Sequence, residues 1–93
     1  MHRSIMMNLD IQRCFLCGRE GAVHAHHCLH GTANRRLAEE DGLIVNLCHA
    51  CHHRLHDTGR GDKELMRVAE SRWIEYNYGS VDEFIGRYGK NYL

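Results

Sequence analysis

Residues 47–56 read LCHACHHRLH, and this stretch brings two kinds of metal-binding residue onto one short segment. Cys48 and Cys51 are three residues apart, which is the spacing of a zinc half-site. His52 and His56 are four residues apart, so on a helix their side chains share a face and can bind one ion together. Successive helical residues are rotated by about 100°, which turns the two pairs to adjacent but distinct sides. The segment therefore predicts two ion sites rather than one mixed site.

A second cysteine pair lies upstream, at Cys14 and Cys17, and Gly18 follows it. Glycine allows the tight backbone turn that a zinc knuckle makes under its metal. We therefore expect the two cysteine pairs together to hold a closed, structural zinc ion. Cys28 is left over and is expected to be a small buried side chain, although a redox-sensitive or metal-adjacent role stays open.

The composition is that of a small globular protein. Its 93 residues are 43% hydrophobic and 26% charged, and five of them are cysteines, an odd number that argues against a disulfide framework. Twelve Lys and Arg balance twelve Asp and Glu, so any nucleic acid must be bound by a local patch or a metal ion, not by bulk charge. The sequence has neither a membrane-length apolar run nor a secretory stretch near its start, so a cytoplasmic location is expected.

Strand and helix signals surround the metal-binding residues. The segment 22–27 predicts a strand, and the apolar segment 43–47 predicts a buried strand. Between them, residues 32–41 predict a helix that Thr32 can cap and Gly42 can end.

Three more helices are predicted downstream. The first runs from residue 48 to about residue 57, and the second covers residues 62–77, capped by Asp62 and closed by Gly79. Residues 80–83 read Ser-Val-Asp-Glu, a capping box that begins a short third helix. The second helix has one apolar face, which is expected to pack against the metal-binding core: Leu65, Ala69, Trp73 and Tyr76.

These signals predict one α+β domain over residues 1–93. Its zinc-stapled core would lie in residues 14–57 and a helical C-terminal extension in residues 62–93. The lead-in, residues 1–13, is not assigned to a strand or a helix.

A histidine pair, His26 and His27, ends the first predicted strand. In order, Cys-x2-Cys, His-His, a β-rich run and Leu-Cys-x2-Cys-His-x3-His occupy residues 14–56, and this pattern resembles the HNH endonuclease family. Residues 79–93 are also similar to small HNH proteins encoded in phage and prophage genomes. The resemblance implies a treble-clef-like ββα-metal core, and a DNA endonuclease working in a bacterial or phage-infected cell.

The resemblance further implies roles for the histidines. His27 would be the general base that takes a proton from the attacking water, a task that suits an imidazole near neutral pH. His26, His52 and His56 would bind the catalytic ion, which would stabilise the leaving oxygen. Imidazole ligands favour a transition metal such as Zn²⁺, Ni²⁺ or Mn²⁺, although Mg²⁺ or Mn²⁺ can still support turnover in the cell.

Family members often have an asparagine that braces the general base. Its expected place holds Leu43 here, so the role is assigned to Asn46, with Asn34 as the other candidate.

Arginines near these residues could bind DNA through its phosphates. The candidates are Arg35, Arg36 and Arg54. For Arg35 and Arg36 a solvated helix face, balanced by the acidic residues 39–41, is an equally good interpretation.

The sequence leaves two functions open. Besides the nuclease, a non-catalytic zinc module that binds nucleic acid or a protein fits the cysteine pairs. His27 distinguishes them, because a purely structural module has no use for a histidine that binds neither ion. The neutral net charge predicts weak unaided affinity for DNA, and hence a partner protein or a homodimer.

Overall fold

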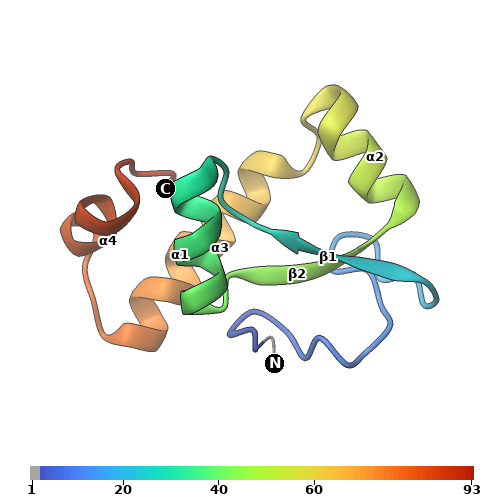
Figure 1. The fold of residues 1–93 in the computed structure, drawn as a ribbon, viewed down its shortest axis with the longest axis horizontal. Coiled ribbons are helices and arrows are strands. Elements are labelled where there is room, and N and C mark those ends of the chain that lie inside the picture. The colour runs from blue at the N-terminus through green and yellow to red at the C-terminus, as the bar shows by residue number, and fades with distance from the viewer. Residues whose placement is uncertain (1–2) are drawn as a thin grey trace.

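A two-stranded antiparallel sheet forms the centre of the computed structural model, which describes residues 3–93 (Figure 1). Strand β1 (Val23–His27) pairs with β2 (Ile44–Cys48) in a register that sets His26 opposite Val45. All of β2 is buried, as the apolar run 43–47 predicts. The sheet therefore holds His26 and His27 at fixed positions, shortly before the helix that begins at Thr32.

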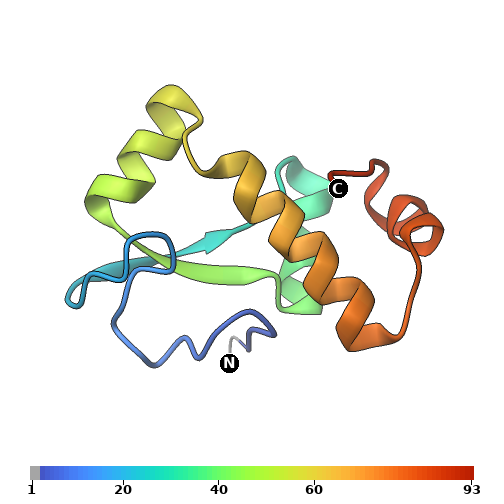
Figure 2. The same ribbon diagram turned by 180° about the vertical axis from the view of Figure 1, so that it is seen from behind.

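Four helices of the described chain surround this sheet. Helix α1 (Thr32–Asp41) connects the two strands, and α2 (His49–Thr58) follows β2 directly and lies over one end of the sheet. Helices α3 (Asp62–Asn77) and α4 (Val81–Tyr88) lie near α1 at the other end, and α3 runs between the two ends (Figures 1 and 2). The predicted α+β class is confirmed, and none of the helices in residues 3–93 is long and apolar enough to cross a membrane.

Two helix N-termini differ from the sequence prediction. Gly31 rather than Thr32 is the N-cap of α1, and Gly61 rather than Asp62 is the N-cap of α3. A glycine has no side chain that could accept hydrogen bonds from the first N–H groups of the helix. The carboxylate of Asp62 instead lies 2.6 Å from Nε2 of His30.

The helix C-termini show one confirmed prediction and one correction. Gly42 ends α1 in the left-handed conformation, with φ of 74°, and a Cβ there would lie 2.7 Å from the carbonyl oxygen of Arg3. At the end of α3 the left-handed position belongs to Tyr78, with φ of 51°, and not to Gly79. The prediction that glycine closes this helix was therefore wrong by one residue.

Aromatic side chains of α3 and α4 form much of the core at the end of the sheet opposite α2. The rings of Phe84 and Tyr88 stack with centroids 4.7 Å apart, and Trp73 meets Phe84 edge-on at 5.6 Å. Cys28 is fully buried in this core, as predicted. Tyr76 does not belong to the apolar face, because 62% of its surface is exposed.

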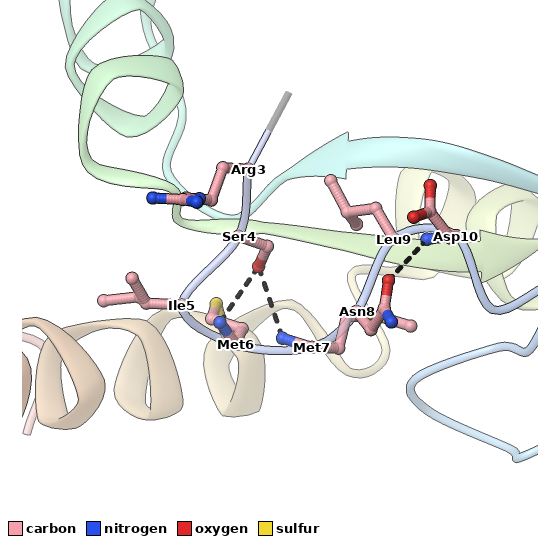
Figure 3. A pocket seen from close by; sticks show the side chains of 8 residues that line it. All are labelled: Arg3, Ser4, Ile5, Met6, Met7, Asn8, Leu9 and Asp10. Atoms are coloured by element: carbon pink, nitrogen blue, oxygen red, sulfur yellow. Dashed lines mark hydrogen bonds between the residues drawn. The ribbon is translucent and has the colours of Figure 1, made fainter. Parts of the chain in front are cut away.

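The described part of the N-terminal lead-in, residues 3–13, forms a loop along β2 outside the named strands and helices (Figure 3). The hydroxyl of Ser4 donates to the carbonyl oxygen of Ile44 at 2.6 Å and accepts from the backbone N–H groups of Met6 and Met7. Residues 3–10 together line a shallow pocket at this loop. The bond from Ser4 to Ile44 ties this loop to β2, and the sequence carries no local strand or helix signal here.

A single carboxylate, that of Asp41, joins α1 to α3 and α4. It accepts hydrogen bonds from Nε1 of Trp73 at 2.9 Å, from Nε and Nη2 of Arg87 at 2.6 and 2.8 Å, and from the hydroxyl of Tyr88. A carboxylate that is shielded from water and satisfied by several donors stabilises the packing of the elements that supply them.

Asp41→Ala should lower the free energy of unfolding by about 3 kcal/mol, because four donor groups on three side chains lose their acceptor. Glu40→Ala is the matched control: its exposed carboxylate lies 3.7 Å from Arg87, and its loss should cost less than about 0.5 kcal/mol. Urea unfolding of the zinc-loaded proteins, followed by circular dichroism, measures both values. Equal effects of the two substitutions would refute the assigned role of Asp41.

Candidate metal centres and the histidine pocket

The two cysteine pairs meet where the N-terminal turn reaches the start of α2. The four Sγ atoms lie within 4.8 Å of one another, and those of Cys17 and Cys48 are 3.8 Å apart. Four sulfurs bound tetrahedrally to one zinc ion at about 2.3 Å are about 3.8 Å from one another. The predicted four-cysteine cluster is therefore present, and it can hold a structural metal ion such as zinc.

The electrostatics of this cluster favour a bound cation. Burial raises the pKa of Cys14, but backbone hydrogen bonds from Cys48, Cys17 and Leu16 outweigh it and bring the pKa to about 6. Burial and hydrogen bonds with the other three thiols raise the pKa of Cys51 to about 12. One thiol thus ionises readily while its neighbour resists, mainly because burial and the neighbouring thiols favour the neutral form of Cys51. A bound divalent ion favours thiolates at all four positions, so metal binding should release protons.

Three imidazoles form a second, separate group. The ligand nitrogens of His26, His52 and His56 lie within 4.8 Å of one another, and Nε2 of His52 is 3.0 Å from Nε2 of His56. Two nitrogens that share one ion at about 2.0–2.1 Å are about 2.8–3.4 Å apart for octahedral to tetrahedral angles. As the helical wheel predicts, this group shares α2 with the cysteines but does not mix with them.

His26 fits an ion ligand by its environment as well. Only 6% of its surface is exposed, and within residues 3–93 its Nε2 has no hydrogen-bond partner. A buried polar atom without a partner is costly, and an ion would satisfy it. Burial lowers the pKa of His26 to about 4, with further lowering by the charges of His52, His30 and His56. The ring is therefore neutral at pH 7 and keeps a lone pair for a metal.

His56→Ala should remove the second ion and leave the cysteine-bound ion in place, because two imidazoles bind a transition metal far more weakly than three. His53→Ala is the matched control. His53 is exposed, its Nδ1 lies 3.3 Å from Oδ2 of Asp57, and it does not belong to the group of three imidazoles. Metal analysis after dialysis against nickel should find about two ions per chain in the wild type and the control, and one in His56→Ala. Two ions in His56→Ala would contradict this ligand assignment.

The three imidazoles open into a pocket of about 370 Å³. Its lining comes from β1, from the β1–α1 loop, from the first turn of α1 and from α2, and it contains imidazoles and one guanidinium but, among the residues that line it, no carboxylate. The lining residues are Ala25, His26, His27, His30, Gly31, Arg35, His52 and His56.

His27 lines this pocket but does not belong to the group of three. Its Nε2 lies 2.8 Å from Oε2 of Glu39 on α1, and 29% of its side chain is exposed. A carboxylate can only accept a hydrogen bond, so the hydrogen of the neutral ring sits on Nε2 and Nδ1 keeps its lone pair. His27 is therefore held by an acidic partner, whereas an asparagine was expected to brace it.

The structure corrects the assignment of that brace. The side-chain N–H₂ of Asn46 donates to the carbonyl oxygens of Leu9 and Ile11 at 2.9 and 3.1 Å, so Asn46 ties the N-terminal loop to β2. The amide of Asn34 donates to the carbonyl oxygen of Tyr88 at 3.2 Å. Both amides are engaged away from His27, and Glu39 takes the bracing position.

The three predicted phosphate-binding arginines lie in different places. Arg35 lines the histidine pocket, whereas Arg54 lines a pocket beside Cys17 and Cys51. Arg36 is exposed and lines neither of these pockets.

Sequence reasoning missed two site residues, Glu39 and His30. Glu39 was interpreted as a surface countercharge, and His30 was not assigned to the site at all. Each is recognised only from its contact across the fold, Glu39 with His27 and His30 with Asp62, and local sequence spacing carries no signal for either contact.

Comparison with known proteins gives no further guide to the site. No family model matches the chain, and neither a curated protein nor a solved structure matches it.

Proposed function

We propose that this chain is a metal-dependent endonuclease of the HNH type, which hydrolyses phosphodiester bonds in DNA. One observation carries the proposal: His27 lines the same pocket as the ion-binding group of His26, His52 and His56, stays outside that group, and is held by a carboxylate. A general base needs this arrangement, with a lone pair available for water and a partner that fixes the ring.

The arrangement of the elements supports the same assignment. β1, β2 and α2 surround the ion-binding histidines in this order, with α1 inserted between the two strands, and the four-cysteine cluster joins the base of α2 to the N-terminal turn. This is the order of parts in a ββα-metal core with a structural zinc ion, and the HNH fold is part of the proposal.

In the proposed reaction Nδ1 of His27 accepts a proton from water as the water oxygen attacks phosphorus. Glu39 accepts a hydrogen bond from Nε2–H and stabilises the imidazolium that results. Arg35 contacts a phosphate oxygen at the rim of the pocket. A divalent ion bound by His26, His52 and His56 would supply positive charge near the leaving oxygen. The bond from phosphorus to the leaving oxygen breaks as the new bond to the water oxygen forms.

The proposed partner is DNA, bound mainly through its phosphate backbone. Because the chain has no net charge, we infer that a partner protein or a second copy raises its affinity in the cell.

Nicking of supercoiled plasmid tests the proposed function. The zinc-loaded wild type should nick the plasmid in Mg²⁺, Mn²⁺ or Ni²⁺ and not in EDTA, and His52→Ala should lose nicking with all three ions. If the wild type binds a second ion yet cleaves nothing, the proposal fails and a non-catalytic zinc module that binds nucleic acid or protein is favoured.

A further inference from the structure

Two tyrosines at the C-terminal end of α3 are exposed to solvent, at the opposite end of this helix from α2 (Figure 2). Tyr76 has 62% of its surface exposed and Tyr78 has 97%. Together with Ile5, Arg72 and Glu75 they line an open hollow of about 650 Å³, and we call these five residues the tyrosine surface. Large apolar side chains that gather on a protein surface are typical of an interaction site.

The backbone of Tyr78 adopts a conformation that a tyrosine disfavours. Its φ is 51°, and within residues 3–93 no other residue except glycine has a positive φ. A glycine at this position would end the helix without strain. The strain presents a ring that makes almost no contact with its own chain. Because strained residues persist where they serve a function, the exposure of Tyr78 indicates a contact outside the chain.

The charges around the two rings favour a protein partner over nucleic acid. A second hollow shares Ile5 and Tyr76 with the tyrosine surface, and residues 39–42 line it as well. Among the residues that line the two hollows, the carboxylates of Glu39, Glu40, Asp41 and Glu75 outnumber the guanidiniums of Arg3 and Arg72. Phosphate binding requires an excess of positive charge, which these hollows do not offer.

The charges of the tyrosine surface itself are self-complementary. Arg72, Glu75 and Tyr76 are spaced three and four residues apart, so they share one face of α3. Arg72 donates a hydrogen bond to the carbonyl oxygen of Met6 at 3.5 Å, but within residues 3–93 neither Arg72 nor Glu75 forms an ion pair.

A surface of this kind can meet a copy of itself. In a twofold-symmetric dimer, residue i of one copy contacts residue j of the other, and j contacts i. Two antiparallel copies of α3 therefore set each Arg72 opposite Glu75 of the other copy, with a Tyr76 on either side. Tyrosine and arginine are also enriched in protein interfaces.

We propose that the tyrosine surface binds the same surface of a second copy of this chain and forms a twofold-symmetric dimer. It shares no residue with the lining of the histidine pocket, so the dimer leaves that pocket open. The surface also assigns to a second copy the role of raising the affinity for DNA, and this last step alone rests on the proposed function.

Tyr78→Gly separates association from folding. Sedimentation equilibrium of the zinc-loaded chain, from micromolar to millimolar concentration, should show a monomer–dimer equilibrium in the wild type. Tyr78→Gly should weaken the dimer by at least about tenfold, because an interface ring is lost from both copies. In dilute protein the same substitution should raise the urea midpoint, because glycine relieves the strain at φ 51°. A wild type that stays monomeric up to millimolar concentration would overturn the proposal.

A charge exchange tests the twofold symmetry. Arg72→Glu and Glu75→Arg should each weaken the dimer about tenfold, because like charges then face each other. The double variant Arg72→Glu/Glu75→Arg should restore it, because each new charge again meets its opposite. Arg67→Glu, at an exposed position of α3 outside both hollows, is the matched control and should dimerise as the wild type does. No recovery in the double variant, or an equal loss in Arg67→Glu, would refute this interface.

Two further outcomes keep the dimer and the nuclease apart. A dimer that cleaves no DNA refutes the proposed function and leaves the tyrosine surface in place, whereas a monomer that cleaves DNA does the reverse. If the chain stays monomeric and Tyr78→Gly instead weakens the binding of a fluorescent single-stranded oligonucleotide, the surface belongs to nucleic acid and the dimer is wrong.

Discussion

His27→Ala should slow DNA cleavage by about 10²–10⁴-fold while both ions stay bound, because positioned general bases contribute about this much. The reason is local. Nδ1 of His27 is the nitrogen that the bond to Glu39 leaves available, and removing the ring leaves water without a proton acceptor. The expected loss lies in kcat, since His27 is not among the ion ligands. Plasmid nicking at a saturating second ion, with metal content measured on the same sample, gives the comparison.

Two further variants separate catalysis from folding at this position. His53→Ala should nick as the wild type does. Glu39→Gln should lose less activity than His27→Ala, about tenfold, because the amide oxygen can still accept from Nε2–H but carries no charge to stabilise an imidazolium. If His27→Ala nicks DNA at the wild-type rate, His27 is not the general base.

Cys48→Ala should abolish zinc binding and leave the chain largely unfolded. Structural zinc contributes about 10–16 kcal/mol in small domains, which exceeds the stability of about 5–15 kcal/mol of typical proteins. Cys48 also ends β2 and is the N-cap of α2, whose backbone N–H at Cys51 points to its sulfur at 3.5 Å. The loss of this sulfur therefore removes a ligand and a helix cap together.

Cys28→Ala is the matched control for this prediction. Cys28 is buried, as Cys48 is, but its sulfur contacts that of Met6 at 3.5 Å and lies outside the four-cysteine cluster. Its replacement should cost about 1–2 kcal/mol and leave the zinc content at one ion per cluster. Zinc analysis and circular dichroism measure both variants. A folded, zinc-free Cys48→Ala protein would show that the cluster does not stabilise the fold.

Local sequence rules predicted the strands, the helices and the spacing within both groups of candidate metal ligands. The helices at residues 32–41 and 62–77 have the predicted bounds, and the capping box at Ser80 forms, with the N–H of Glu83 donating to its hydroxyl at 3.1 Å. Ligand spacing predicted the cysteine and imidazole pairs, because two or three intervening residues fix where side chains point on a turn or a helix.

Contacts between distant segments could not be predicted in this way. The partners of His27 and His30 lie 12 and 32 residues away, on helices whose packing against the sheet is a property of the whole fold. Asn46 was predicted to brace His27, but its side-chain amide donates to the carbonyl oxygen of Leu9 in the N-terminal loop. Gly31 and Gly61 are the N-cap residues where Thr32 and Asp62 were predicted. The carboxylate of Asp62 bonds to His30 instead of capping its helix.

The most direct test measures the cleavage rate against the occupancy of the histidine-bound ion. Protein with one zinc ion per chain is titrated with nickel, and single-turnover cleavage of a defined DNA duplex is followed at each addition. The account predicts no cleavage before nickel and a rate that rises to saturation at one nickel ion per chain, with no rise in His56→Ala. Cleavage that is already complete with zinc in the cysteine cluster alone, or absent when both sites are filled, would contradict it.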